Sequence, residues 1–160
     1  MSVEKVREYL ALYGKSDAVT EFSVSSATVA LAAEALGVSP ARIAKTISFT
    51  NGNGGCTLIV AAGDAKIDNG KYKACFGMKA TMLTPEDAWR LTGHAVGGVC
   101  PFAIENPDVA VYTDQSLKRF STVFPAAGSS SSAVELTCEE LFRISRSRDW
   151  VDICKGWQDE

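Results

Sequence analysis

The sequence predicts an α+β fold, in which a single domain of residues 1–160 has a largely antiparallel, mixed β-sheet core flanked by helices. The 160 residues are enough for one hydrophobic core and too few for two ordinary domains. Runs rich in β-branched residues occupy the middle of the chain, whereas capped segments with helical periodicity occupy its ends and edges. A composition of 46% hydrophobic and 22% charged residues is typical of a chain that folds alone.

Two helices are expected before the first long strand. Apolar residues recur at helical spacing through residues 3–13, and a glycine follows them. Ser25 or Ser26 can cap a second helix over residues 29–36, which a further glycine ends at Gly37. Both segments are short and amphipathic, so we expect them to pack on a sheet.

The middle of the chain reads as strands. Residues 43–50 and 56–61 are rich in β-branched residues, and the glycine-rich segment 51–55 between them predicts an antiparallel hairpin. Further strands are expected at residues 80–83, 109–112, 122–126 and 133–136.

Three more helical segments accompany these strands. A short helical piece is expected within residues 66–73. Thr84 followed by Pro85 and two acidic residues marks the start of a helix that ends at Gly93. A capping-box pattern beginning at Thr137 predicts a last helix. Asp64, Asp68 and Asp114 stand near strand ends, where turn formation and helix capping account for them.

Charge and cysteine content exclude several classes of function. A net charge of −3 and a pI near 5.2 disfavour a protein that coats duplex nucleic acid, although a contact with one end of an RNA remains open. The single histidine, His94, leaves little for a histidine-based metal cluster. Five irregularly spaced cysteines without a CxxC pair indicate reduced thiols. No apolar run approaches the roughly 18 residues of a membrane span, and no signal pattern opens the chain, so we expect a cytoplasmic protein without membrane contact.

Lys45 is the first candidate functional residue. The two-residue period of its strand places it on the same face as Ile47 and Phe49, which should be the buried face. A buried lysine loses hydration and needs partners at the edge of a pocket. The alternative is a lysine whose stem runs along the sheet and whose ammonium reaches solvent.

The second candidate is the loop Gly97-Gly98-Val99-Cys100-Pro101. Its glycines allow the backbone to approach a ligand closely, and backbone N–H groups aimed at an oxyanion stabilise attack on an ester. A plain connecting loop is the alternative. Because Cys100 follows His94 by six residues, a thiol nucleophile with a histidine base is also considered, against the commoner case of a small buried cysteine.

The order of several motifs resembles that of the YbaK/prolyl-tRNA-synthetase-associated domain family of aminoacyl-tRNA editing domains. The resemblance covers about residues 20–145. It is carried by five segments in order, which are Val38–Thr46, Ala62–Asp64 leading into Ile67–Asp68, Thr92–Gly93 with Gly97–Phe102, Tyr112–Asp114 with Ser116–Leu117, and Ala127–Gly128 before Val134–Thr137.

This resemblance implies a trans-acting aminoacyl-tRNA deacylase, which hydrolyses the ester between a wrongly attached amino acid and the terminal ribose of a tRNA. It implies no metal or organic cofactor. Lys45, Gly97 and Gly98 are then expected at the reaction centre, where the lysine holds the acceptor end or carbonyl region and the loop positions ester and water. The remaining substrate-binding candidates are Thr46, Val99, Cys100, Pro101, Asp114 and Gly128.

The expected partner is the acceptor end of an aminoacyl-tRNA, with a synthetase as a second candidate partner. The chain is expected to be a monomer or a homodimer. Two other functions are considered as alternatives. One is a non-catalytic module of the same fold that binds tRNA or a synthetase, and the other is a thiol hydrolase that depends on Cys100.

Overall fold

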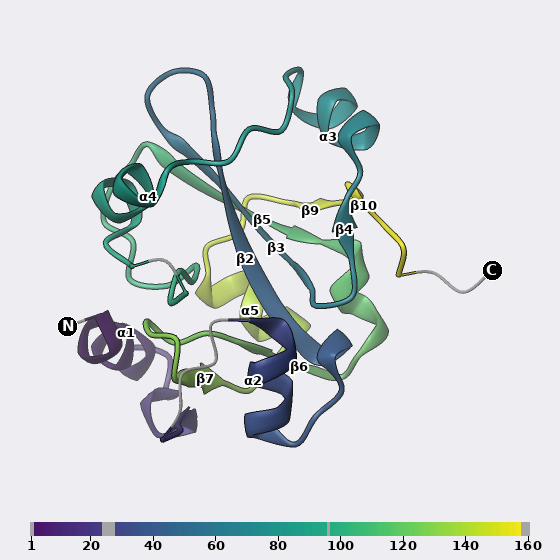
Figure 1. Cartoon of the computed structure of the whole chain (residues 1–160). Helices are drawn as coiled ribbons and strands as arrows, with labels where there is room; N and C mark the ends of the chain where they lie inside the picture. Colours follow the sequence, from purple (N-terminus) through teal and green to yellow (C-terminus); the bar gives the residue numbers. More distant parts are fainter. Residues whose placement is uncertain (1, 24–27, 96, 158–160) are drawn as a thin grey trace.

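A six-stranded mixed sheet forms the centre of the fold (Figure 1). Its strands lie in the order β8 (Leu136–Thr137), β6 (Thr122–Pro125), β2 (Ile43–Thr50), β3 (Cys56–Ala62), β5 (Val109–Asp114) and β9 (Trp150–Val151). Two small sheets pair β1 (Val19–Glu21) with β7 (Ser132–Val134) and β4 (Lys66–Ile67) with β10 (Cys154–Lys155). The structure is a computed structural model, and it describes residues 2–23, 28–95 and 97–157.

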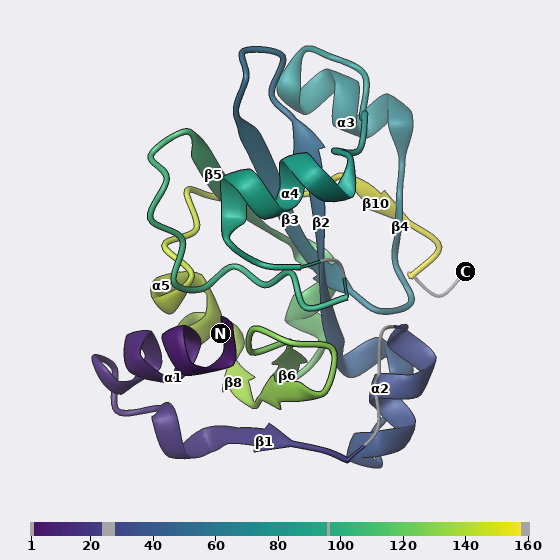
Figure 2. The ribbon, with the colours of Figure 1, turned by 60° about the vertical axis from the view of Figure 1, so that its left-hand side comes forward.

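Helices surround the central sheet. They are α1 (Ser2–Ala11), α2 (Val29–Leu36), α3 (Asn69–Phe76), α4 (Pro85–Thr92) and α5 (Cys138–Ile144), with short 3-10 turns η1 (Ser16–Ala18), η2 (Pro40–Arg42) and η3 (Gln115–Arg119). Figure 2 shows α4 in front of β2 and β3, with α2 below it. The α+β prediction is confirmed. Of the seven pairings between strands of the described residues, four are antiparallel, and the parallel ones join β2 to β6, β3 to β5 and β5 to β9.

The β2–β3 hairpin is the longest pairing and confirms the prediction. It runs in antiparallel register from Ala44 opposite Ala62 to Thr50 opposite Cys56. The Asn51 side chain closes the turn, because its Oδ1 accepts hydrogen bonds from the N–H groups of Asn53 (2.8 Å) and Gly55 (2.9 Å). Every residue of β3 is buried, so this strand is the centre of the core.

Side-chain caps fix the helix starts that shape the site. Thr84 Oγ1 accepts from Asp87 N–H at 3.2 Å, and Thr137 forms the predicted capping box with Glu140. For α2 the cap in the structure is Thr28, whose Oγ1 accepts from Leu31 N–H at 3.2 Å. The predicted caps Ser25 and Ser26 lie outside the described residues.

Three predicted boundaries differ from the structure. Residues 80–83 form no strand, only a single bridge between Met82 and Phe49, because Thr84 begins α4 directly afterwards. The strand expected at 133–136 is divided between β7, which pairs with β1, and β8, which pairs with β6. The first helix ends at Ala11, ahead of its expected end at residue 13.

The core lies between the sheet and the helices at its faces. Val6 and Leu10 of α1 and Leu141 and Ile144 of α5 are fully buried together with the apolar residues of β3. Tyr72 of α3 packs on Phe49 with ring centroids 5.0 Å apart. Within the three described ranges, no helix has the length and apolar character needed to cross a membrane.

Removal of the α4 cap should loosen the helix without changing the fold. We expect Thr84→Ala to lower the free energy of unfolding by about 1 kcal/mol, because the N–H of Asp87 loses its acceptor. Urea denaturation followed by circular dichroism measures this difference. Thr81→Ala is the matched control. Thr81 accepts a hydrogen bond from Thr50 N–H through its backbone carbonyl, which the substitution keeps, so the loss in free energy of unfolding should be much smaller. Equal losses in the two variants would contradict a capping role for Thr84.

Candidate active site

A pocket of about 490 Å³ opens between α2, β2, α4 and two loops. Apolar side chains of α2 and α4 form two of its walls, and the β6–β7 turn and the loop after α4 form the others. This main pocket contains the predicted site residues Lys45, Thr46, Gly97 and Val99. They come from segments some fifty residues apart in sequence, and the fold brings them together.

The floor of the main pocket is an open stretch of the β2 edge. Pairing with β6 ends at Ala44, opposite Pro125. Beyond the gap, Leu83 N–H donates to Ser48 O (3.0 Å) and Thr50 N–H donates to Thr81 O (2.9 Å). Backbone groups alternate between the two edges of an antiparallel strand, so the N–H and C=O of the intervening residue 46 face the same edge. No strand of the described residues pairs with them there.

Thr46 adds an unpaired hydroxyl to this edge. Its Oγ1 is buried and has no hydrogen-bond partner among the described residues. A buried polar atom without a partner costs about 1–3 kcal/mol, so such an atom in a pocket is suited to bind a ligand. Side chain and backbone of Thr46 thus offer three polar groups at one place.

Lys45 is held inward by main-chain carbonyls. Its Nζ donates to Gly63 O at 3.4 Å and to Ala65 O. Burial lowers the pKa of the lysine, and the nearby carboxylate of Asp64 opposes this shift. On the same strand face Phe49 is buried, whereas Lys45 and Ile47 are half-buried and line the pocket. The ammonium therefore stands at the pocket boundary.

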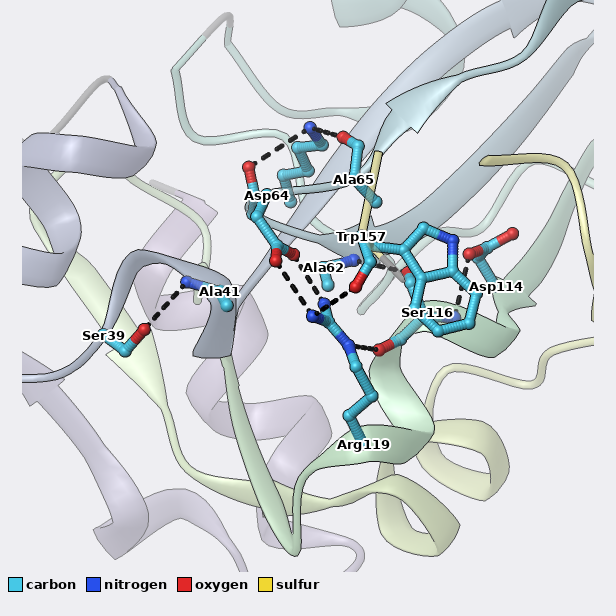
Figure 3. A network of polar contacts seen from close by, with 11 residues as sticks. Ser39, Ala41, Ala62, Asp64, Ala65, Asp114, Ser116, Arg119 and Trp157 are labelled. Carbon is cyan, nitrogen blue, oxygen red and sulfur yellow. Dashed lines mark hydrogen bonds and ion pairs between the residues drawn. The ribbon is translucent and has the colours of Figure 1, made fainter. Parts of the chain in front are cut away.

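The turn that supplies these carbonyls is fixed on two sides. A Cβ on Gly63 would lie 2.1 Å from Pro40 O, so only glycine allows this approach to η2. On the other side Asp64 accepts two hydrogen bonds from Arg119, at 2.9 and 2.5 Å, and these bonds lower the pKa of the carboxyl group (Figure 3). Arg119 also donates to Trp157 O at 3.1 Å. The carbonyls around Lys45 are thus held in place.

The glycine loop borders the pocket with its first half. Gly97 and Val99 line the pocket, and Gly97 has a φ of 91° that side chains other than glycine rarely adopt. Gly98 lies behind them, packed so closely on the β6–β7 turn that a Cβ would be 2.7 Å from Ser129 Cα. Gly98 positions the loop, and its neighbours face the cavity.

The structure places four other predicted site residues outside the pocket lining. Asp114 is fully buried, where its carboxylate accepts from Ser116 N–H (2.9 Å) and Ile153 N–H (3.0 Å). This is the capping role that its position at a strand end predicts. Pro101 lines a second hollow, Cys100 is fully buried, and Gly128 has a positive φ of 101° beside the buried Ala127.

The surroundings of Cys100 do not suit a nucleophile. Burial raises the pKa of its thiol to about 12. Its Sγ is 3.5 Å from Nε2 of His94, but that nitrogen is 2.8 Å from Phe102 O. A nitrogen whose N–H donates to a carbonyl has no lone pair for the thiol proton. Burial also lowers the pKa of His94, which disfavours an imidazolium partner.

Sequence reasoning missed the helical walls of the pocket. Val29, Ala32 and Leu36 of α2 line it, although their helical spacing reads as a core-facing stripe. The available signal was the surplus of apolar residues: α2 has seven of them in eight positions, yet Ala33 alone is buried. A helix that is apolar all round and little buried leaves apolar surface free for a ligand.

Within the described residues, no three His, Cys, Asp or Glu side chains group as metal ligands.

Residues 24–144 match the family of the aminoacyl-tRNA editing domain. The chain belongs to this family. The order of its motifs and the position of its pocket can therefore be compared with those of related proteins. The resemblance inferred from the sequence is confirmed, over a range close to the expected one.

The chain is also similar to individual proteins and to solved structures. The chain is 53% identical to protein YwhH of Bacillus subtilis over 99% of this chain and 100% of that one. It is 26% identical to EbsC of Enterococcus faecalis, a provisionally assigned Cys-tRNA(Pro)/Cys-tRNA(Cys) deacylase, over 72% of this chain and 71% of EbsC. A solved structure, that of a provisionally assigned trans-editing enzyme for prolyl-tRNA synthetase, superposes with a TM-score of 0.86 at 29% identity, covering 97% and 98% of the two chains.

The burial of the cysteines predicts their order of reaction. We expect Cys75, which is exposed, to react first with an aromatic disulfide reagent in the native protein, and Cys56, Cys100 and Cys154 to react only on unfolding. Burial raises the pKa values of these three thiols to about 11, 12 and 12, respectively, so little thiolate is present near neutral pH. The release of chromophore with and without denaturant measures this.

Cys75→Ser provides the control, because it should remove the fast phase and leave the slow one. Rapid modification of Cys100 in the native Cys75→Ser protein would show that this thiol is accessible and reactive after all.

Proposed function

We propose that this chain is an aminoacyl-tRNA deacylase, which hydrolyses the ester bond between an amino acid and the 3′ end of a mischarged tRNA. The observation that carries the proposal is the main pocket, in which the open β2 edge at Thr46, the Lys45 side chain, and Gly97 and Val99 of the glycine loop border one cavity. Membership in the editing-domain family supports the same activity. No metal or organic cofactor is part of the proposal.

The proposed reaction needs a water molecule and oriented polar groups. The water oxygen bonds to the ester carbonyl carbon, and the bond from that carbon to the ribose oxygen breaks. The ribose oxygen takes up a proton, so the products are the free amino acid and a terminal ribose hydroxyl. An aminoacyl ester is already activated, so orientation of the water and stabilisation of the oxyanion supply most of what is needed. One preorganised N–H donor is worth about 3 kcal/mol in such a step.

The backbone of the open edge and of the loop provides donors in the proposed mechanism. The N–H of Thr46 has no strand partner among the described residues, and the glycine loop brings further main-chain groups to the same cavity. Such groups are rigid because β2 is paired along its other edge and Gly98 is packed on Ser129. A fixed dipole stabilises a developing negative charge without having to reorganise.

Lys45 supplies positive charge to the substrate. Its ammonium has three N–H donors, of which two bond to the carbonyls of Gly63 and Ala65. The third is left for the ester carbonyl region or the acceptor end of the tRNA. Because the turn fixes the other two bonds, the ammonium is placed before the substrate arrives.

The pocket walls indicate which amino acids are removed. Among the described residues that line the pocket, Lys45 is the one with an ionisable side chain, and the walls from α2 and α4 are apolar. A basic side chain would lose hydration there without a carboxylate partner, and an acidic side chain would find only the Lys45 ammonium, which the proposal assigns to the ester end of the substrate. The proposed substrates are therefore esters of neutral amino acids. A single methylene changes binding by only about 1–3 kcal/mol, so a fine choice among them depends on pocket volume.

A thiol hydrolase and a non-catalytic module are the rival functions. The buried Cys100, with its raised pKa and without a free histidine base, argues against the first. The second would keep the pocket but release no amino acid. A synthetase is a further proposed partner, since the solved relative is described as acting for prolyl-tRNA synthetase.

Removal of the Lys45 charge should abolish most of the activity. We expect Lys45→Met to reduce kcat/KM for mischarged tRNA by roughly 100-fold, as loss of a preorganised electrostatic contact does. The measurement is amino-acid release from a panel of mischarged tRNAs that includes alanyl- and cysteinyl-tRNA(Pro). Lys66→Met, in an exposed lysine of β4, removes the same charge outside the pocket and should leave the rate unchanged.

Two results would decide against the proposal. Hydrolysis by Lys45→Met at the unmutated rate, together with loss of activity in Cys100→Ala, would select the thiol hydrolase. Binding of mischarged tRNA by the unmutated chain without release of any amino acid would select the non-catalytic module.

A further inference from the structure

A second hollow, of about 290 Å³, lies between the loop before β5, the residues after α5, and α1. Figure 2 shows α5 and this loop on the same side of the molecule, next to α1. Ala103 and Arg146 both line it, with φ angles of 58° and 57°. They are the non-glycine residues with positive φ in the described chain. Such backbone geometry is costly and concentrates at functional surfaces, so this hollow is a candidate for one.

The arginines of the chain divide into two groups. Arg7, Arg42, Arg90 and Arg119 each form an ion pair with a carboxylate. The other three, listed together, are Arg143, Arg146 and Arg148. No carboxylate in the described ranges pairs with any of these three, and all three are exposed. In a chain of net charge −3, unneutralised guanidinium groups within six residues leave a local positive surface.

Aromatic rings hold two of these guanidinium groups in place. Arg143 lies over the Tyr13 ring, 6.0 Å from its centroid, and Arg146 lies over the Tyr9 ring at 5.5 Å. The two rings pack on each other with centroids 5.5 Å apart. A guanidinium has five N–H donors in a planar fork that matches a phosphate. The hydroxyl groups of Tyr13 and Tyr9 accept from Arg146 and use only part of its donors.

The glycine loop connects this arginine cluster to the main pocket. Gly97 and Val99 line the main pocket, and Pro101 and Ala103 line the second hollow. Only a few residues of one loop thus separate the cavity proposed for the ester from the surface with unpaired arginines. An RNA with its 3′ end in the main pocket has phosphates a short distance away along its strand.

We propose that Arg143, Arg146 and Arg148 bind the phosphate backbone of the acceptor stem while its 3′ end occupies the main pocket. This inference rests on the proposed function, because the tRNA is its ligand. Glu105 also lines the second hollow, and Asp149 follows the cluster in sequence. Neither forms an ion pair with the three arginines, which leaves their charge available to phosphates. Such a contact depends on the position and charge of the phosphates and is independent of the base sequence.

The test measures the binding of an uncharged acceptor-stem RNA hairpin to the full chain by fluorescence anisotropy. We expect the double variant Arg146→Ala/Arg148→Ala to bind the hairpin about tenfold more weakly. The slope of log Kd against the logarithm of the salt concentration should fall by about one to two. Arg90→Ala is the matched control, because Arg90 is also exposed but is paired with Asp87 on α4. Unchanged affinity in the double variant, or an equal loss in Arg90→Ala, would overturn the proposal.

A second variant guards against misfolding. Glycine adopts the positive φ of residue 146 readily, so Arg146→Gly should keep the fold while it removes one guanidinium. Thermal unfolding by circular dichroism confirms that each variant is native. Weaker RNA binding by native Arg146→Gly supports the cluster, and binding equal to that of the unmutated chain counts against it.

Failure of this inference and failure of the proposed function give different results. The hairpin carries no ester, so its binding reports on the arginines alone. Arginine-dependent binding of the hairpin, together with no release of amino acid from the panel of mischarged tRNAs, upholds the cluster and removes the hydrolase. Conversely, deacylation with the same KM in the unmutated chain and in Arg146→Ala/Arg148→Ala upholds the hydrolase and removes the cluster.

Discussion

The contact between the Lys45 ammonium and the carbonyls of Gly63 and Ala65 determines how the site is built. A cation at the boundary of a core needs acceptors that replace water, and main-chain carbonyls supply them without bringing a neutralising charge. These carbonyls stay in place because the turn around Gly63 packs on Pro40 and is tied through Asp64 to Arg119. The fold thus holds the amine of the lysine in one place at the boundary of the cavity.

Most of the elements could be predicted because their signals are local. The Asn51 side chain bonds within four residues to close the hairpin, and Thr84 and Thr137 cap helices within three. The inward placement of Lys45 also follows from the two-residue period of its strand. The strand expected at 80–83 was wrong because the start of α4 at Thr84 competes for the same short segment.

The composition of the site depended on contacts between distant residues and was only partly predictable. Gly97 and Cys100 stand in one loop, yet one lines the pocket and the other is fully buried, because packing of Gly98 on Ser129 sets the course of the loop. Asp114 was counted with the site, but its carboxylate binds the N–H of Ile153, 39 residues further on. The open edge at Thr46 exists because β6 ends at Pro125, which no pattern within β2 reveals.

Net charge is a poor guide to whether such a chain accepts an anionic substrate. Electrostatic interactions between exposed groups fade beyond about 8 Å at physiological salt, so a phosphate responds to the groups near it and not to the sum over the protein. Four arginines form ion pairs with carboxylates, so their positive charges are locally neutralised. Lys45 lines the main pocket and Arg146 and Arg148 line the second hollow, and no carboxylate of the described residues forms an ion pair with them. An acidic protein can therefore hold the end of an RNA, provided that its positive charges are unpaired where the strand passes.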